Sequence, residues 1–225
     1  MLKFLGKIFI GPGTTDDEKI DRAYKQQISH LDEVWNDHKD SSYGIERILR
    51  LFLVIIQFIY PTLLLRNIFG NYGRYARKLV VEFYAVAKLL FPIFALASGL
   101  YKSSFIIAFN VYLLTETIFN ISGLIFLSDI YSVTISYRRS ILLLLLNYVG
   151  VTLGFSIVYS GFDLLNKALS PISAVYYSFV TTTTLGYGEY YPKNGSGQIV
   201  VISQLIVFIL FVVLFINYFS SRLDH

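Results

Sequence analysis

The stretch PISAVYYSFVTTTTLGYGEYYP, residues 171–192, decides the fold of this chain of 225 residues. It lies between two long apolar segments, 141–159 and 198–219. It follows Ser170, so a serine cap precedes a proline at the first helical position, a favourable helix start. A helix that ends near Thr183 is too short to cross a ~30 Å hydrocarbon core. We therefore expect it to enter the membrane from the outer surface and to end at mid-depth.

The residues after this short helix must return to the same surface in a non-helical form. Non-helical backbone at membrane depth is tolerated only where it is buried in protein or lines an ion path. Gly186 and Gly188 permit the dihedral angles that let successive carbonyl groups point the same way, and Thr184 adds a hydroxyl oxygen. Such oxygen dipoles can replace the hydration shell of a monovalent cation. The C-terminal end of the short helix, with roughly half a negative charge, also favours a cation there.

The motif TTTTLGYGE, residues 181–189, resembles the TxxTxGYG signature of the potassium-channel family, with Leu185 where that family usually has Val or Ile. The order of outer helix, pore helix, filter, acidic residue and inner helix is similar to that family over about residues 141–219. The resemblance implies passive conduction of K⁺. One pore loop is present and a filter needs four, so it also implies a homotetramer with the ion path on its four-fold axis.

The resemblance assigns roles to individual residues. The selectivity filter comprises Thr184, Leu185, Gly186, Tyr187 and Gly188, and the carbonyls of the first four form the K⁺ sites. The supporting residues are Thr183, Glu189, Tyr176 and Tyr177. Tyr187 is expected to point away from the pore and to pack against the two tyrosines of the pore helix. Glu189 either hydrogen-bonds to Tyr176 or is a solvated carboxylate at the outer mouth.

Composition separates this chain from most soluble proteins and from several kinds of enzyme. Hydrophobic residues make up 55% of the chain, and there is no cysteine, which excludes disulfides, thiolate metal sites and cysteine nucleophiles. No phosphate loop, nucleophile elbow or metal motif is present, so we expect no enzymatic activity. We also expect no cofactor, with K⁺ acting only as the permeant ion, and no nucleic-acid partner.

Three further apolar segments precede the pore region. They span residues 51–65, 79–101 and 104–127. The sequence therefore predicts an all-α membrane protein in the lipid bilayer, with a two-helix pore domain over 141–225 that contains the re-entrant pore helix and filter. A membrane domain of two or three helices over 48–140 precedes it, after a charged amphipathic segment over 1–47.

Positive charge orients the last four apolar segments. Seven Lys and Arg residues lie on one side of them and three on the other. The seven are Arg66, Arg74, Arg77, Lys78, Arg138, Arg139 and Arg222, and the three are Lys102, Lys167 and Lys193. The positive-inside rule then predicts a multi-pass protein of the cell membrane with a cytoplasmic C-terminus. Segment 51–65 holds only 15 residues and is either a tilted span, a re-entrant piece or an interfacial helix, so the side of the N-terminus stays open.

A helix is also predicted within residues 14–40. Thr15 and Glu18 have the spacing of a capping box. An apolar stripe follows at Ile20, Tyr24, Ile28, Leu31 and Trp35. We expect this amphipathic helix to pack through the stripe, either on the membrane surface or against another part of the protein. A regulatory partner or ligand there is unknown.

Two features differ from the family. The inner helix, 199–219, contains no glycine or proline, which argues against a glycine-hinged opening. We hypothesise instead a hydrophobic constriction that gates by dewetting. Its candidate residues are Phe208, Val212, Phe215 and Ile216. The only basic residues between 103 and 140 are Arg138 and Arg139, so we expect weak or absent voltage gating, which a recording of gating currents would test.

Glu116 lies in the middle of an apolar segment, where a bare carboxylate is costly. We expect it to be neutral or to pair with Lys88, Asn110 or Asn120.

Three alternative functions fit the residues less well. A K⁺ transporter usually carries four degenerate pore units in one chain, a non-selective channel usually has an altered filter, and an accessory protein would not need a filter.

Overall fold

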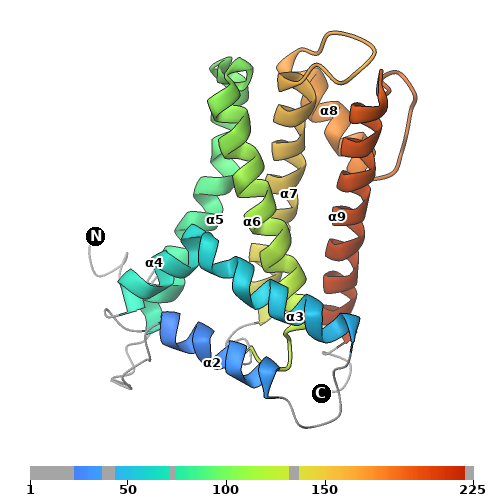
Figure 1. Cartoon of the computed structure of the whole chain (residues 1–225). Helices are drawn as coiled ribbons and strands as arrows, with labels where there is room; N and C mark the ends of the chain where they lie inside the picture. Colours follow the sequence, from blue (N-terminus) through green and yellow to red (C-terminus); the bar gives the residue numbers. More distant parts are fainter. Residues whose placement is uncertain (1–22, 37–43, 71–73, 132–136, 221–225) are drawn as a thin grey trace. The chain divides into compact units, whose positions relative to one another are not determined.

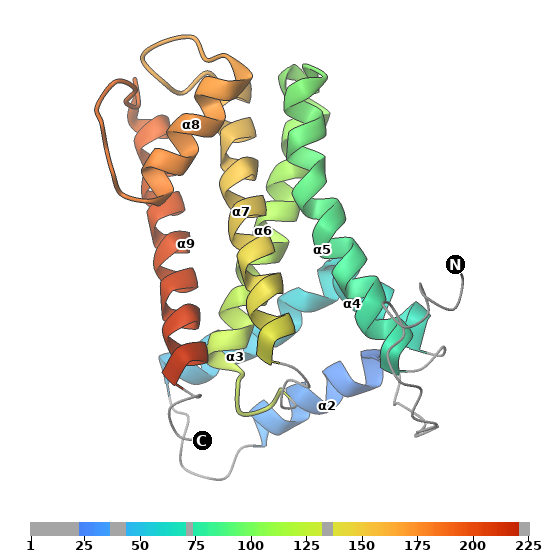
Figure 2. The ribbon, with the colours of Figure 1, turned by 180° about the vertical axis from the view of Figure 1, so that it is seen from behind.

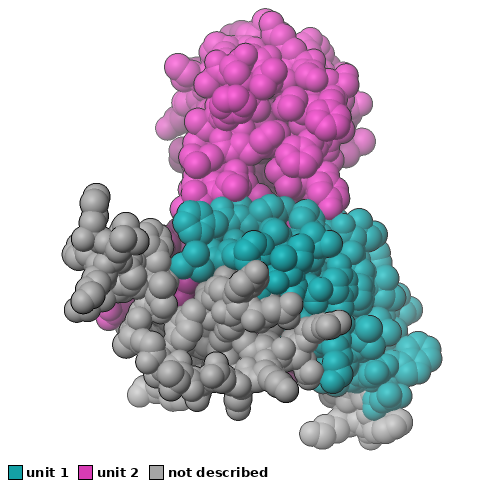
Figure 3. All heavy atoms as spheres, turned by 90° about the vertical axis from the view of Figure 1, so that its left-hand side faces the viewer, with its two compact units in different colours: residues 1–84 teal, residues 85–225 magenta. Residues whose placement is uncertain are grey.

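The computed structural model describes residues 23–36, 44–70, 74–131 and 137–220. It divides into two compact units, residues 1–84 and 85–225 (Figure 3). This border differs from the predicted borders after residues 47 and 140, and the three-part division stays a prediction. The helices in chain order are α2 (Ala23–Trp35), α3 (Ile45–Ile56), η1 (Gln57–Ile59), α4 (Pro61–Gly70), α5 (Arg74–Ala97), η2 (Leu100–Lys102), α6 (Ser104–Phe126), α7 (Tyr137–Gly161), α8 (Pro171–Thr182) and α9 (Gly195–Ser220). The predicted all-α class is confirmed.

In the first unit, α2 packs against α3 and α4, and the predicted stripe takes part through Tyr24, whose ring centre lies 6.2 Å from that of Phe58. Its buried residues are Ala23, Gln27, His30 and Val34. Ile28 and Trp35 of the predicted stripe are exposed instead, and Ile20 lies outside the described residues. Gln27 also donates hydrogen bonds to the Val54 carbonyl at 3.0 Å and to the Gln57 side chain at 3.2 Å. Packing of the stripe against protein is therefore partial, and its packing on the membrane surface stays a prediction.

The apolar segment predicted over 51–65 is broken at Tyr60. This residue is extended, as is typical before proline, and Pro61 begins α4. The limbs Ile45–Ile59 and Pro61–Phe69 meet at 67°. The segment is thus not one straight helix.

Within the residues that the structure describes, four helices are long and apolar enough to cross a membrane. They are Leu79–Ala97, Ser104–Phe126, Arg138–Gly161 and Gly195–Asn217. These agree with the second to fifth predicted segments, and the protein is a multi-pass membrane protein.

Small and polar residues bring α6 close to α7 in the second unit. A Cβ at Gly154 would lie 2.6 Å from Leu114, and one at Gly161 would lie 2.6 Å from Ile107. Asn110 of α6 donates to the Gly154 carbonyl at 2.9 Å. Without a hydrophobic driving force between helices in lipid, close packing and interhelical hydrogen bonds of this kind hold them together.

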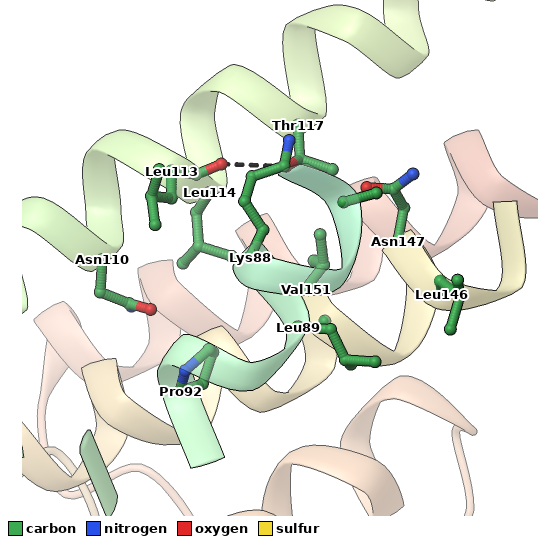
Figure 4. Close-up of a pocket in the computed structure, with 12 residues that line it drawn as sticks. Lys88, Leu89, Pro92, Asn110, Leu113, Leu114, Thr117, Leu146, Asn147 and Val151 are labelled. Atoms are coloured by element: carbon green, nitrogen blue, oxygen red, sulfur yellow. Dashed lines mark hydrogen bonds between the residues drawn. The ribbon is translucent and has the colours of Figure 1, made fainter. Parts of the chain in front are cut away.

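The expected partner of Glu116 is Lys88. The Lys88 ammonium lies 3.5 Å from the Glu116 carboxylate, which is fully buried, and donates to the Thr117 hydroxyl at 3.0 Å. Figure 4 shows the Lys88 side chain beside Thr117, at a small cavity of about 20 Å³ that Asn110 and Asn147 also line. Of the three predicted partners of Glu116, Lys88 is thus the one that pairs with it, and the pair joins α5 to α6.

Lys88→Met should lower the free energy of unfolding by about 3–5 kcal/mol, because it leaves the Glu116 carboxylate buried without its cation. The double variant Lys88→Met/Glu116→Leu should recover most of that loss. Thermal unfolding in detergent measures both, and Lys102→Met, at an exposed site, is the matched control. A single variant as stable as the control would contradict a structural role for the pair.

Candidate functional site

The short helix of the pore region is α8. The Ser170 hydroxyl accepts a hydrogen bond from the Ser173 amide at 3.1 Å, so the predicted serine cap and the start at Pro171 are confirmed. α8 runs obliquely between α7 and α9, and the segment after it returns to the beginning of α9 (Figures 1 and 2). This is the topology of a re-entrant loop.

The C-terminal end of α8 is level with the middle of both flanking helices. Ser178 donates to the Thr152 carbonyl at 2.6 Å, and Thr182 contacts Gln204. Thr152 lies nine residues before the end of α7, and Gln204 nine residues after the start of α9. At 1.5 Å per residue, α8 therefore ends about 14 Å from the helix ends.

Gln204 is the centre of a buried hydrogen-bond cluster that joins α7, α8 and α9. Its carbonyl oxygen accepts from the Tyr159 hydroxyl at 2.6 Å. Its amide donates to Ser178, at 3.0 Å to the carbonyl and 2.9 Å to the hydroxyl, and also to the Thr182 hydroxyl. This cluster was not predicted from the sequence. The signal was Gln204, a glutamine well inside a charge-free apolar helix, where a polar side chain needs a partner.

The filter segment has an alternating backbone. Thr184, Gly186 and Gly188 have φ of 59°, 58° and 81°, whereas Leu185 and Tyr187 between them are not in the positive-φ region. Alternation of left- and right-handed residues aligns successive peptide groups, with the amides on one side of the chain and the carbonyls on the other. Positive φ is unusual for a β-branched residue such as Thr184, and strained residues of this kind cluster at functional sites.

The carbonyls of this segment have no partner within the described chain. No described hydrogen bond is accepted by the backbone oxygen of Thr184, Leu185, Gly186 or Tyr187. The last backbone hydrogen bonds before the filter are donated by the Thr184 amide to the Thr181 carbonyl and by the Leu185 amide to the Val180 carbonyl, both at 3.0 Å. Residues 183–189 are all exposed in the single chain. The backbone oxygens of Thr184 to Tyr187 thus accept no hydrogen bond from the described residues of the single chain.

The two tyrosines of α8 predicted to support the filter have different partners. Tyr176 stacks on Tyr187, with ring centres 6.4 Å apart and an interplanar angle of 3°. Tyr177 packs instead against Tyr159, at 4.9 Å, and against Tyr190, at 6.4 Å. Burial raises the pKa of the Tyr177 phenol, which therefore stays neutral.

The two polar support residues have different surroundings. The Thr183 hydroxyl donates to the Phe179 carbonyl at 2.8 Å, within the turn that ends α8. Glu189 is exposed, and in the described part of the chain no hydrogen bond joins it to Tyr176. Its role stays a prediction.

Contacts between the two ends of the pore loop hold the returning segment. The Asn166 amide donates to the Tyr191 carbonyl and the Lys193 amide to the Leu164 carbonyl, each at 2.9 Å. Lys193 also forms an ion pair with Asp163. A Cβ at Gly197 would lie 2.8 Å from the Leu164 carbonyl, so only glycine allows this close approach.

Three of the candidate gate residues, Phe208, Val212 and Phe215, lie on one half-buried face of α9, and Ile216 is exposed beside it. The Phe208 ring lies 6.4 Å from that of Tyr148 on α7, and Phe215 packs against the core between the helices. Val212 is half-buried, and Ile216 is exposed. Ile216 belongs to a row of exposed apolar residues at spacings of three and four. The row is Ile199, Ile202, Ile206, Ile209, Val213 and Ile216.

Comparison with known proteins identifies the C-terminal part of the chain. Residues 141–225 match the model of a family described as an ion channel. No curated protein and no solved structure matched the chain. The resemblance to the potassium-channel family inferred from residues 141–219 is confirmed at the level of this pore domain. The molecule is therefore a multi-pass membrane protein whose residues 141–225 are similar to an ion channel.

Gln204→Leu should lower the free energy of unfolding by about 1–3 kcal/mol, because the Tyr159 hydroxyl loses its acceptor while it stays buried. In Gln204→Leu/Tyr159→Phe both polar partners are gone, so part of the loss should be recovered. Thermal unfolding of the purified protein in K⁺ solution compares the two variants with the parent. Equal stability of all three would show that the cluster contributes nothing.

Proposed function

We propose that the chain is one subunit of a potassium-selective channel that conducts K⁺ passively through Thr184, Leu185, Gly186, Tyr187 and Gly188. The observation that carries the proposal is the row of carbonyls without partners on a backbone of alternating φ. Backbone oxygens at membrane depth are tolerated where they line an ion path. Rings of such oxygens replace the hydration shell of K⁺ in channels of this kind.

The surroundings of the filter support a cation at its inner end. The C-terminus of α8 carries a partial negative charge and lies immediately before the filter. The Thr184 hydroxyl adds an oxygen to those of the carbonyls. No catalytic step is required, because selectivity follows from the exchange of water for protein oxygens. The proposed activity of the protein is therefore ion conduction and not catalysis.

Four copies of the chain are needed to close the ring around the ion. One chain supplies one filter segment, with its polar backbone exposed. Such backbone cannot face lipid, so neighbouring copies and the ion path must cover it. The exposed apolar row of α9, from Ile199 to Ile216, supplies a further surface for contact with other copies or with lipid. A homotetramer with a four-fold axis follows.

Orientation in the cell membrane follows from the distribution of positive charge. Arg138 and Arg139 lie in the first turn of α7, whereas Lys167 and Lys193 lie at the opposite end of the pore helices. The positive-inside rule assigns the first side and the C-terminus to the cytoplasm. The pore loop is then extracellular.

The filter proposal predicts that Gly186→Ala lowers K⁺ flux into liposomes by about tenfold or more, since a Cβ disfavours φ of 58° in every copy. Gly195→Ala is the matched control, because a Cβ there meets nothing within 4 Å and φ is not in the left-handed region. The parent should pass K⁺ and Rb⁺, should nearly exclude Na⁺ and should be blocked by Ba²⁺. Equal Na⁺ and K⁺ flux in the parent would refute K⁺ selectivity.

We further propose that α9 forms a hydrophobic gate and that the gate lies on the exposed apolar row from Ile199 to Ile216. Ile216→Ser should then raise open probability several-fold in single-channel recordings, because a polar ring wets a narrow pore. Phe208→Ser is the control, since that ring packs towards Tyr148. An unchanged open probability for Ser or Ala at Phe208, Val212, Phe215 and Ile216 alike would exclude the constriction.

A further inference from the structure

The first unit presents one continuous apolar face on α3 and η1. Large side chains are exposed at spacings of three and four residues, each by at least 45%. They are Ile45, Ile48, Phe52, Ile55 and Ile59. At about 100° per residue these positions fall on one side of a helix. We call them the apolar face of α3.

The opposite face of α3 is bound to α2. Leu53, Val54 and Gln57 are buried there, and the Gln27 amide bonds to the last two. Arg47 donates to the carbonyl of Trp35, and its guanidinium lies 5.7 Å from the centre of the Trp35 ring. α2 and α3 are therefore in contact near both ends of each helix.

This attachment decides whether α3 can cross a membrane. α2 packs against both α3 and α4, and it exposes Lys25, Asp32 and Glu33. If either limb entered the hydrocarbon core, these charged side chains would enter with it, which is costly. Ile45–Ile59 is also only about 22 Å long, against a core of about 30 Å. The geometry is that of a helix at the membrane surface.

We propose that the apolar face of α3 is a lipid-binding surface that lies in the bilayer interface and does not span it. The bilayer is within reach because the first membrane span begins at Leu79, nine residues after α4 ends at Gly70. Residues 44–70 contain three arginines and one glutamate. Arg50 is buried and paired with Glu46, so the net positive charge that favours an anionic lipid surface comes from Arg47 and Arg66. An amphipathic helix with this charge is typical of interfacial anchors.

An interfacial α3 also determines on which side of the membrane α2 lies. Because α3 and α4 do not cross, α2 and the start of α5 lie on the same side of the membrane. The positive charge before the first span makes that side the cytoplasm. This inference concerns the first unit alone and does not rest on K⁺ conduction.

Spin labelling of the full chain in liposomes of phosphatidylcholine and phosphatidylglycerol tests the proposal. The absence of native cysteines lets single labels report without background. Labels replace Ile48, Phe52, Ile55 and Ile59 in turn, with Asp32→Cys as the aqueous control and Phe94→Cys, exposed on the span of α5, as the lipid control. Collision rates with oxygen and with a polar nickel complex give the depth of each label.

All four labels on the apolar face should favour oxygen over nickel and should lie at one shallow depth. A depth that changes steadily, by about 16 Å from residue 48 to residue 59, would show a span and would overturn the proposal. Exclusion of both reagents would show that a protein surface covers the face, and access to nickel would show that water does. Either result would also overturn it.

Reaction with a membrane-impermeant maleimide tests the topology separately. Asp32→Cys should react from the same side as Ser128→Cys, in the turn after α6, and not from the side of Lys167→Cys. Reaction together with Lys167→Cys would place α2 across the membrane and would contradict an interfacial α3.

Discussion

A peptide group at the depth of a bilayer must be hydrogen-bonded or must face an ion, and this requirement governs the C-terminal unit. The spanning helices meet it by internal hydrogen bonds. The filter segment does not, because its carbonyl oxygens, on a backbone of alternating φ, receive no hydrogen bond from a donor in the described part of the chain. A permeant cation is the chemical species that satisfies such oxygens. The same feature that would be a defect in a soluble loop is therefore the basis of the proposed function.

A strained segment of this kind persists only when its surroundings hold it. Positive φ at Thr184 costs of order 1–3 kcal/mol. The Gln204 cluster fixes the end of α8 just before the strained residue, and the paired ends of the pore loop fix the segment after it. Tyr187 stacks on α8 between these two anchors. Rigid support on both sides allows the backbone to keep a conformation that it would otherwise leave.

The sequence predicted the parts of the fold that depend on local chemistry. The start of α8 followed from Ser170 and Pro171, the four spans from apolar length, and the Glu116–Lys88 pair from the cost of a buried charge. The rotation of helices about their axes was harder to predict, because it depends on contacts between segments distant in sequence. α2 buries the polar residues Gln27 and His30 beside the apolar Ala23 and Val34, and Phe208 lies towards Tyr148. Gln204 could have been singled out, but its partners on α7 and α8 could not.

Ion positions in the assembled protein test the central claim most directly. Crystals grown with Tl⁺, a K⁺ analogue with strong anomalous scattering, should show a row of anomalous peaks on a four-fold axis. The peaks should lie between the carbonyls of Thr184 and Tyr187 and should disappear when Na⁺ replaces Tl⁺. Filter segments that share no axis, or an axis without Tl⁺ between these carbonyls, would contradict the account.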